Sequence, residues 1–249
     1  MKFSAILTFA VLASVALASP IIPERRARNA ARLQVRTAQR HSNFPFKAGT
    51  NEILHSNETI HEQYSSNWAG AVLIGSGYTS VTGIFTVPTP SVPSGGSSEE
   101  QYCATAWVGI DGDTCGSAIL QTGVDFCVDS SGPNFDAWYE WFPDYSHDFS
   151  GISFSAGDKV KVTVDASSKT GGTATIENQT TGKTVTQTFT GQITNALCET
   201  NAEWIMEDFS SLVSLVPFAN FGTVTFTDIS ATSGGSSIGA SGATIIDIQ

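Results

Sequence analysis

From residue 64 onward, short apolar runs alternate with residues that form turns. The runs are rich in Val, Ile, Thr, Phe, Tyr and Trp, and Gly, Ser, Pro, Asn or Asp interrupts them. An interruption every eight to twelve residues or so is typical of all-β proteins. The pattern predicts strands at residues 68–74, 79–87, 105–110, 118–126, 137–142, 152–154, 159–166, 172–178, 183–190, 202–209, 222–228 and 243–248.

Helices have little place in this pattern. Only residues 210–218 have the composition of a short helix, and no stretch keeps a long amphipathic period. Residues 88–98, 167–172 and 232–242 are predicted loops. Strands without a helical layer bury their apolar faces sheet on sheet. We therefore predict an all-β fold, a single antiparallel β-sandwich of two sheets.

The N-terminal residues have the features of a signal peptide. Lys2 precedes an apolar stretch that ends in small residues at Ala16-Leu17-Ala18. The stretch is shorter than the roughly 20 residues of a membrane-spanning helix. We expect residues 1–18 to be a cleaved signal, and the protein to be secreted and extracellular without a membrane anchor.

Charge divides the rest of the chain into two parts. Residues 19–63 are rich in Arg and Ala and lack strand-like alternation, which predicts a basic propeptide. In residues 64–249, the expected mature domain, four lysines stand against nineteen carboxylates and leave a net charge of −15. Protonation of the carboxylates relieves this repulsion, so we expect an acidic working medium. We expect no nucleic-acid partner for so acidic a domain. We hypothesise that the propeptide binds the acidic domain as an inhibitor and weakens its hold as carboxylates protonate.

The cysteine pattern favours disulfides over metal binding. An exported protein is expected to oxidise its thiols, and the spacing alone allows three pairings. Zinc is a weak alternative because no CxxC occurs and His147 is the only histidine after His61. We expect no metal and no cofactor. Asn178 begins a glycosylation sequon in the mature part. The four cysteines are Cys103, Cys115, Cys127 and Cys198.

Most hydrolytic sites can be excluded by inventory. A serine or cysteine hydrolase needs a histidine as its general base, and His147 is the only histidine in the mature part of the sequence. There is no GxSxG, no HExxH and no Asp-Thr-Gly element of an aspartic peptidase. Carboxylate chemistry without a metal remains.

Alternation gathers polar groups on single faces of three predicted strands. One strand carries Gln121 and Asp125 on one face, and another carries Glu203 and Glu207. On a third strand the corresponding face has Asp136, Trp138 and Glu140. The interleaved aromatic residues favour a binding cleft over an ordinary solvent-exposed face.

Five blocks of sequence stand out in the mature part. They are residues 67–70 (Asn-Trp-Ala-Gly), 107–115 (Trp-Val-Gly-Ile-Asp-Gly-Asp-Thr-Cys), 120–123 (Leu-Gln-Thr-Gly), 136–141 (Asp-Ala-Trp-Tyr-Glu-Trp) and 201–209 (Asn-Ala-Glu-Trp-Ile-Met-Glu-Asp-Phe). These blocks resemble those of the fungal glutamic peptidases, the eqolisins. The resemblance runs from about residue 66 to the C-terminus and is specific, because the blocks occur in order with similar spacing.

The resemblance implies a fold and a catalytic pair. The fold is a sandwich of two concanavalin A-like or jelly-roll sheets, with the active cleft on the concave face of one. The family's catalytic glutamate falls on Glu207, not on Glu203, and its catalytic glutamine falls on Gln121. One family disulfide falls on Cys115 and Cys198, which leaves Cys103 to pair with Cys127.

Further residues match positions near the family's cleft. The expected substrate-binding residues are Trp68, Trp107, Trp138 and Glu140. Two more, Asp111 and Asp125, are expected to hydrogen-bond residues behind the cleft.

These assignments predict an acid endopeptidase for protein or peptide substrates. Glu207 would take a proton from a water held against Gln121, whose amide would stabilise the oxyanion. The alternatives are a glycoside hydrolase and a lectin-like carbohydrate-binding module on a similar sandwich. Glu203 and Glu207 lie about 13 Å apart along a strand at about 3.3 Å per residue, beyond the roughly 5 to 9.5 Å of a glycosidase pair. A cross-strand pair such as Glu140 with Glu207 stays open. We expect a monomer.

Overall fold

The computed structural model describes residues 39–54, 62–211 and 214–249, which belong to one compact unit. The expected signal peptide and residues 19–38 and 55–61 of the expected propeptide lie outside the described residues. In the described part, no helix has the length and apolar character needed to cross a membrane. Residues 39–54, which fall in the expected propeptide, are called the prosegment below.

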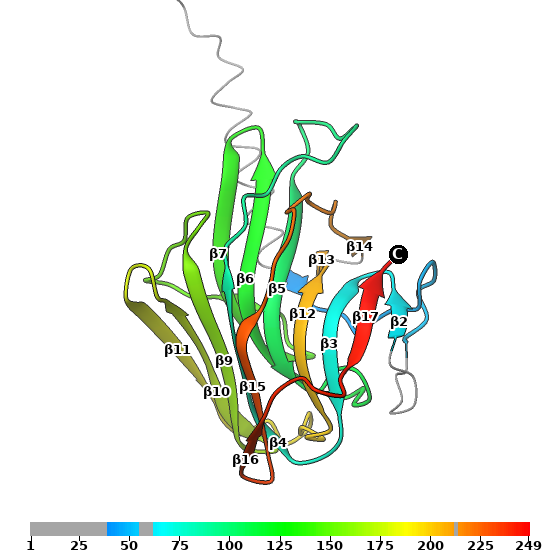
Figure 1. The fold of residues 1–249 in the computed structure, drawn as a ribbon, viewed down its shortest axis with the longest axis vertical. Helices are drawn as coiled ribbons and strands as arrows, with labels where there is room; N and C mark the ends of the chain where they lie inside the picture. The colour runs from blue at the N-terminus through cyan, green and yellow to red at the C-terminus, as the bar shows by residue number, and fades with distance from the viewer. Residues whose placement is uncertain (1–38, 55–61, 212–213) are drawn as a thin grey trace, which may run out of the picture. The chain divides into compact units, whose positions relative to one another are not determined.

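Two large sheets make up the fold (Figure 1). The eight-stranded sheet contains, in spatial order, β2 (Glu62–Ser65), β17 (Thr244–Ile248), β3 (Trp68–Ile74), β12 (Asn201–Glu207), β5 (Tyr102–Ile110), β6 (Ile119–Asp129), β7 (Gly132–Phe142) and β8 (His147–Asp148). The six-stranded sheet contains β11 (Lys183–Phe189), β10 (Gly171–Asn178), β9 (Lys159–Ser168), β4 (Tyr78–Thr86), β15 (Thr227–Ser233) and β16 (Ser236–Ile238).

The main core lies between these two sheets. Alternate residues of β5 and β6, such as Val108 and Leu120, are fully buried in one cluster with Val162 of β9 and Ile176 of β10. Neighbouring strands are antiparallel except β2 and β17, which are parallel. The prediction of an all-β fold is confirmed, and the two layers have the arrangement of a sandwich.

Four predictions about local structure are wrong. Residues 152–154, a predicted strand, belong to no strand. Residues 210–218 do not begin as a helix, because β13 (Ser210–Ser211) and β14 (Ser214–Leu215) form a small sheet with β1 (Arg40–His41). The predicted loop at 232–242 contains β16. Residues 222–226 have strand-like alternation, yet pairing with β4 starts only at Thr227 and shifts register before Ser230.

The outer face of the eight-stranded sheet, called the site face below, carries the polar residues singled out by alternation. Strand register arranges them in rows that cross the strands. One row contains Trp68, Glu207, Thr105 and Asp125, the next contains Ile205, Trp107, Gly123 and Trp138, and a third contains Glu203, Gly109, Gln121 and Glu140.

Two glycines make room for Trp107 on the site face. A Cβ atom on Gly123 would lie 2.6 Å from the Cβ of Trp107, and one on Gly109 would lie 2.8 Å from its ring. A larger residue at either position would displace the indole. Trp107 therefore lies close against the sheet between the row of Glu207 and the row of Gln121.

Both expected disulfides are present. Cys103 and Cys127 are cross-strand neighbours on β5 and β6, and Cys115 joins Cys198 across a separation of 83 residues. The second bond links the loop after β5 to the segment before β12.

The structure argues against a glycan on Asn178. The side chain is fully buried, and its Nδ2 donates to the Ser153 carbonyl at 3.0 Å and to Asp158 Oδ2 at 2.9 Å. A glycan on Nδ2 would break these bonds and would have no path to solvent. The sequon instead shapes the turn after β10, because Oδ1 accepts the N–H groups of Thr180 and Thr181.

Asp111 fastens the segment before β12 to the end of β5. Its φ is 68°, and its two carboxylate oxygens accept the N–H groups of four consecutive residues, with distances of 2.7 to 3.3 Å. These donors are Cys198, Glu199, Thr200 and Asn201. The carboxylate thus sets where β12 begins, and β12 carries Glu207.

We expect Asp111→Asn to destabilise the full chain. An amide turns one acceptor oxygen into a donor that faces N–H groups, which should lower the free energy of unfolding by about 3 kcal/mol. Urea unfolding followed by tryptophan fluorescence measures it. Asp129→Asn is the control, because its carboxylate accepts one N–H group, from Ser131. Equal stability of the two variants would contradict this role.

Candidate active site

Glu207 lies at the end of β12 on the site face and is fully buried. Its Oε2 accepts a hydrogen bond from Trp107 Nε1 at 2.9 Å, and its Oε1 accepts one from the backbone N–H of Asn43 at 2.9 Å. The first contact orients the carboxyl group. The second brings a peptide group of the prosegment to it.

Burial raises the pKa of Glu207 to about 7. The Asn43 N–H, the charge of Arg40 and hydrogen bonds from Ser42 and Trp107 lower the pKa, but burial outweighs them. In the covered site, Glu207 therefore holds its proton in acid.

Gln121 lies on β6 on the same face and is also fully buried. Neither atom of its side-chain amide has a hydrogen-bond partner within the described residues. Strand β5 and the row of Trp107 lie between Gln121 and Glu207. The structure thus brings both expected catalytic residues to one face, where the Gln121 amide has hydrogen-bonding capacity to spare.

Glu203 lies four residues before Glu207 but has different neighbours. Its Oε1 accepts the N–H of Asp113 at 3.1 Å. Burial, followed by the charges of Asp113 and Asp111, raises its pKa well above the usual value. Glu203 shares a row with Gln121, so register alone does not single out Glu207. The hydrogen bond from the Asn43 N–H distinguishes the surroundings of Glu207 from those of Glu203.

Arg40 of the prosegment is buried on the site face. Its guanidinium donates two hydrogen bonds to Asp125, at 2.7 and 3.0 Å, and lies 3.7 Å from Glu140. It also stacks over the rings of Trp138 and Phe209, 3.8 and 4.4 Å from their centroids. A planar cation between two carboxyls and two aromatic faces is strongly held.

The prosegment continues from Arg40 across the site face. The N–H of Ser42 donates to Glu140 Oε2 at 3.3 Å, and the side chain of Asn43 donates to Ser210 Oγ at 2.8 Å. The ring of Phe44 then packs edge-on against Phe142, 4.8 Å between centroids. The sequence indicated a basic propeptide over an acidic domain but not which arginine binds, because several arginines occur at similar spacing.

The expected binding tryptophans lie around this path. Trp68 packs edge-on against Trp107, with centroids 5.0 Å apart, and Trp138 donates to Thr105 Oγ1 at 3.0 Å. All three indoles are fully buried while the prosegment is bound. Trp138 also contacts the Arg40 guanidinium, so a bound chain reaches it directly.

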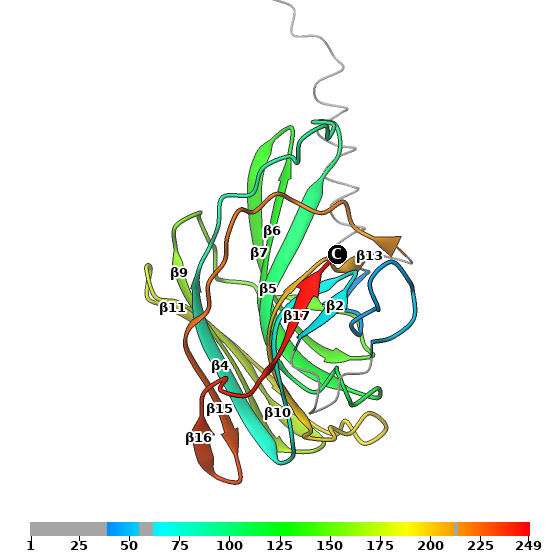
Figure 2. The same ribbon diagram turned by 45° about the vertical axis from the view of Figure 1, so that its right-hand side comes forward.

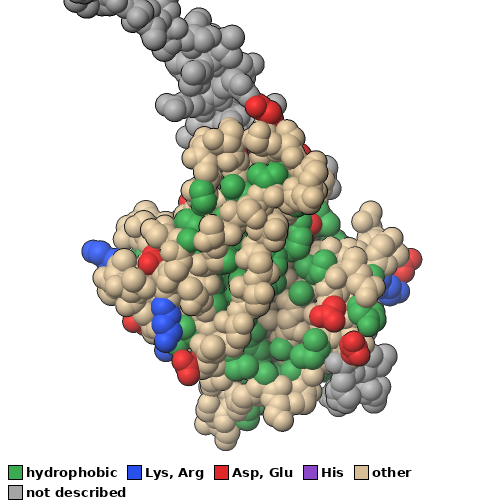
Figure 3. All heavy atoms as spheres, turned by 45° about the horizontal axis from the view of Figure 1, so that its top comes forward, with side chains coloured by type: hydrophobic (Ala, Val, Ile, Leu, Met, Phe, Trp, Pro, Cys, Tyr) green, Lys and Arg blue, Asp and Glu red, His purple; other side chains and the backbone are tan. Residues whose placement is uncertain are grey.

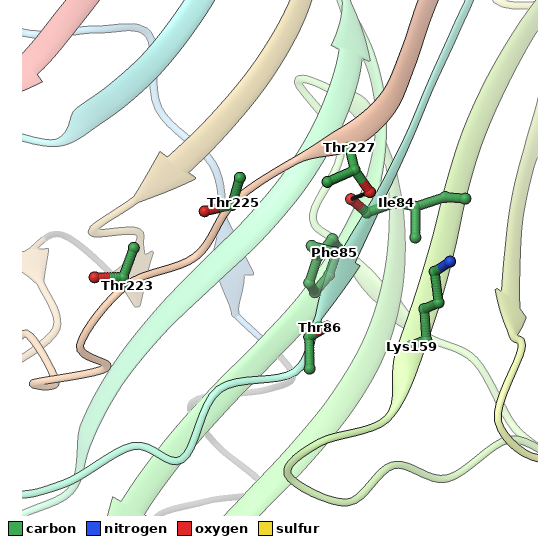
Figure 4. A pocket seen from close by; sticks show the side chains of 7 residues that line it. All are labelled: Ile84, Phe85, Thr86, Lys159, Thr223, Thr225 and Thr227. Atoms are coloured by element: carbon green, nitrogen blue, oxygen red, sulfur yellow. Dashed lines mark hydrogen bonds between the residues drawn. The ribbon is translucent and has the colours of Figure 1, made fainter.

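Other parts of the described structure offer no comparable chemistry. The sulfurs of Cys115 and Cys198 lie near Asp111, but their disulfide removes them as metal ligands. A hollow of about 270 Å³ over β4 and β9 is lined by threonines, Ile84, Phe85 and Lys159, with no carboxylate or imidazole (Figure 4). The face drawn in Figure 3 carries isolated charged side chains and no basic patch.

Comparison with known proteins identifies the family. The profile of the peptidase A4 family matches residues 66–249. The chain belongs to the peptidase A4 family. The identification of a glutamic peptidase from the five sequence blocks is thereby confirmed at the level of the family, and the chain is an enzyme of the peptide-hydrolase class.

Named relatives and solved structures agree with this. The chain is 58% identical over 264 residues to aspergillopepsin-2 of Aspergillus niger, covering 100% of this chain and 93% of the relative. It is 44% identical over 257 residues to scytalidopepsin B of Scytalidium lignicola, covering 100% and 92%. Scytalido-glutamic peptidase with a transition-state analog inhibitor matches with a TM-score of 0.67 and 46% identity, over 74% of this chain and 88% of that one.

The buried carboxyl of Glu203 should make the fold less stable as pH rises. Its pKa in the folded state is raised, so the folded chain holds a proton that the unfolded chain releases above its ordinary pKa of about 4.3. Stability is therefore full below about pH 4 and is lost as pH rises through the raised pKa.

Between about pH 4 and 7 the free energy of unfolding should fall in the wild type. In Glu203→Gln we expect that fall to be smaller by more than about 1 kcal/mol. The amide keeps an acceptor for the Asp113 N–H and does not ionise. Urea unfolding of the full chain at several pH values measures the difference, with the outward-facing Glu177→Gln as control. Parallel curves for wild type and Glu203→Gln would count against this role.

Proposed function

We propose that this family member is a secreted acid endopeptidase in which Glu207 and Gln121 activate water against a peptide bond. The observation that carries the proposal is the contact between Glu207 and the backbone N–H of Asn43. A buried carboxyl that binds the amide nitrogen of an extended peptide stands where a leaving nitrogen needs a proton. A carbohydrate has no backbone N–H to donate to this carboxyl group, so the sugar-binding alternatives are not favoured.

The proposed chemistry divides between a carboxyl and an amide. With the cleft open, ionised Glu207 takes a proton from a water that Gln121 helps to hold, and that water attacks the carbonyl carbon. The Gln121 NH₂ group donates to the oxyanion of the tetrahedral intermediate. Protonated Glu207 then gives its proton to the departing nitrogen, while Trp107 Nε1 keeps the carboxyl in position.

The same proposal assigns roles to the remaining site residues and to the N-terminal segments. Trp68, Trp107, Trp138 and Glu140 bind substrate. Asp111 holds the segment before β12, and Asp125 accepts hydrogen bonds from the bound chain on the site face. We propose residues 1–18 as a signal peptide and residues up to about 63 as a propeptide. The substrates are proteins and peptides, the protein acts as a monomer, and the sandwich is of the concanavalin A-like type.

The prosegment inhibits the enzyme in this proposal. Asn43 occupies the carboxyl oxygen that would bind water, and Arg40 anchors the segment through Asp125 and Glu140. The carbonyl of Ser42 lies 3.2 Å from His41 Nδ1, while the amide of Gln121 has no partner within the described residues. The segment thus covers the pair without the oxyanion contact that cleavage requires.

We expect Glu207→Gln to lower peptide cleavage by about a thousandfold or more, because it removes the general base. Activity of the wild type should fall as pH drops below the pKa of Glu207 in the open enzyme, because the protonated carboxyl no longer accepts a proton. Digestion of an unfolded protein in acid by the processed chain measures both.

Glu203→Gln is the matched control, since Glu203 is a buried glutamate on the same strand and face. It should cut like the wild type. If Glu203→Gln were inactive and Glu207→Gln active, the base would be Glu203. If neither substitution reduced cutting, the carboxylate mechanism would be wrong.

We expect a synthetic peptide of residues 39–54 to inhibit the processed enzyme. Arg40→Met should weaken it about 30-fold or more, because Asp125 and Glu140 lose their cation while buried. Lys47→Met is the control, since Lys47 pairs with Glu52 on the exposed surface, and such pairs contribute about 1 kcal/mol or less.

The effect of Arg40→Met should shrink in acid. Burial raises the pKa of Asp125 and of Glu140 in the covered site, and the charge of Arg40 offsets part of that rise, so the cation favours their ionised forms. The ratio of the two inhibition constants should therefore be larger above these raised pKa values than at about pH 4, where both buried carboxyls hold their protons with either peptide. A ratio near one at both pH values would refute the anchoring role of Arg40.

A further inference from the structure

Asn67, the residue before β3, binds the main chain of the prosegment. Its Nδ2 donates to the carbonyl oxygen of Phe44 at 3.1 Å, and its Oδ1 accepts the N–H of Phe46 at 2.8 Å. Oδ1 also accepts from Ser65 Oγ at 3.0 Å. The side chain is fully buried and uses both ends of its amide.

The two main-chain groups bound by Asn67 form a recognisable pair. A parallel β-strand binds the carbonyl of one residue and the N–H two residues further on. The Asn67 amide makes that pair of bonds around Pro45 and so imitates a neighbouring strand. Its orientation is unambiguous, because a backbone N–H only donates and a carbonyl only accepts. Such a contact recognises any extended peptide without reading its side chains.

Asn67 lies beside the catalytic carboxyl. Its neighbour Trp68 is in register with Glu207, and its own carbonyl accepts the N–H of Asp208 at 2.9 Å. The chain bound by Asn67 reaches it directly after Asn43, whose nitrogen lies on Glu207. Figure 2 shows that the prosegment, drawn in blue, then runs beside β2, where Lys47 pairs with Ser65.

We propose that Asn67 is a substrate-positioning residue for the leaving-group side of the peptide. It binds the carbonyl of the second residue and the N–H of the fourth residue after the cleaved bond. This rests on the proposed function, because it takes the nitrogen on Glu207 as the leaving nitrogen. Asn67 makes no hydrogen bond to the nitrogen of the third residue, which is Pro45 in the prosegment. Proline is therefore accepted at that position of the substrate.

The consequence is a preference for substrates that extend at least four residues past the cleaved bond. Three peptides with a common sequence test it. The first ends one residue after the bond, the second extends four residues, and the third is the second with an N-methyl group on the fourth nitrogen. The full chain is activated in acid, and variants that do not process themselves are treated with a trace of tagged wild type, which is then removed.

For the wild type we expect kcat/KM to rise about tenfold from the short to the extended peptide, as two backbone hydrogen bonds would give. N-methylation should remove part of that gain. In Asn67→Ala the ratio of kcat/KM for the extended peptide to kcat/KM for the short peptide should fall towards one. N-methylation of the extended peptide should then leave kcat/KM unchanged. Ser66→Ala is the control and should keep the wild-type ratio, because the half-buried Ser66 hydroxyl contacts Lys47, Gly49 and Thr50, which correspond to residues beyond the fourth.

Two results would overturn the proposal. One is a wild-type ratio near one. The other is an Asn67→Ala enzyme that slows on both peptides equally and keeps the ratio, which would make Asn67 a structural residue only.

A binding measurement separates this proposal from the proposed function. Should the wild type cleave no peptide, the affinity of a peptide of residues 40–48 is compared with that of its analogue N-methylated at Phe46. If the analogue binds the wild type more weakly than the parent peptide but binds Asn67→Ala equally well, Asn67 positions the peptide main chain whether or not the enzyme cleaves it. Equal affinities would refute this role.

Discussion

The site depends on carboxyl groups that are buried on one face of a sheet with little positive charge to balance them. Asp125, Glu140, Glu203 and Glu207 all have a raised pKa, and burial is the largest cause for each. Within the described part of the chain, the cation that pairs with Asp125 and Glu140 is Arg40, which the prosegment supplies. A buried carboxylate without a partner is costly, so such a face is stable when its groups are protonated, hydrated or covered by a cation.

In the proposed function, that constraint links inhibition by the prosegment to catalysis. The buried carboxyls that need a counter-ion or a proton are there the groups proposed to meet a peptide substrate, so the segment that neutralises them would also fill the cleft. Arg40 binds Asp125 and Glu140, and only two residues later Ser42 donates its N–H to Glu140. Charge therefore fixes the prosegment at one end, while the main-chain contacts of Asn43, Phe44 and Phe46 hold its course past Glu207 and Asn67.

Much of the fold and part of the site could be predicted from the sequence because alternation is a local property. The strand from Trp68 to Ile74 was predicted with its observed bounds, and the faces of β6 and β12 that carry Gln121 and Glu207 follow from period two. Register is not local. Nothing in the alternation of β5, β6 and β12 says that Gln121 shares a row with Glu203 rather than with Glu207.

The errors have the same origin. Residues 222–226 alternate like a strand, but pairing with β4 begins only at Thr227, and residues 210–211 pair with β1 of the prosegment. Both outcomes depend on partners far away in the sequence. Asn67 was noticed only as part of a motif, because an asparagine that binds a backbone looks in sequence like any other asparagine before a strand.

The choice of glutamine at position 121 follows from the same scarcity of positive charge. Gln121 is the cross-strand neighbour of Glu140, whose pKa is already raised by burial and by the charge of Glu207. A glutamate at position 121 would add a further negative charge that the face cannot balance. Protonated in acid, it would donate a single O–H bond in place of the two N–H bonds of the amide. An amide has no charge to bury, keeps its donors at every pH and still offers an oxygen to a water. An uncharged donor beside one titrating glutamate is therefore the arrangement that this acidic face permits.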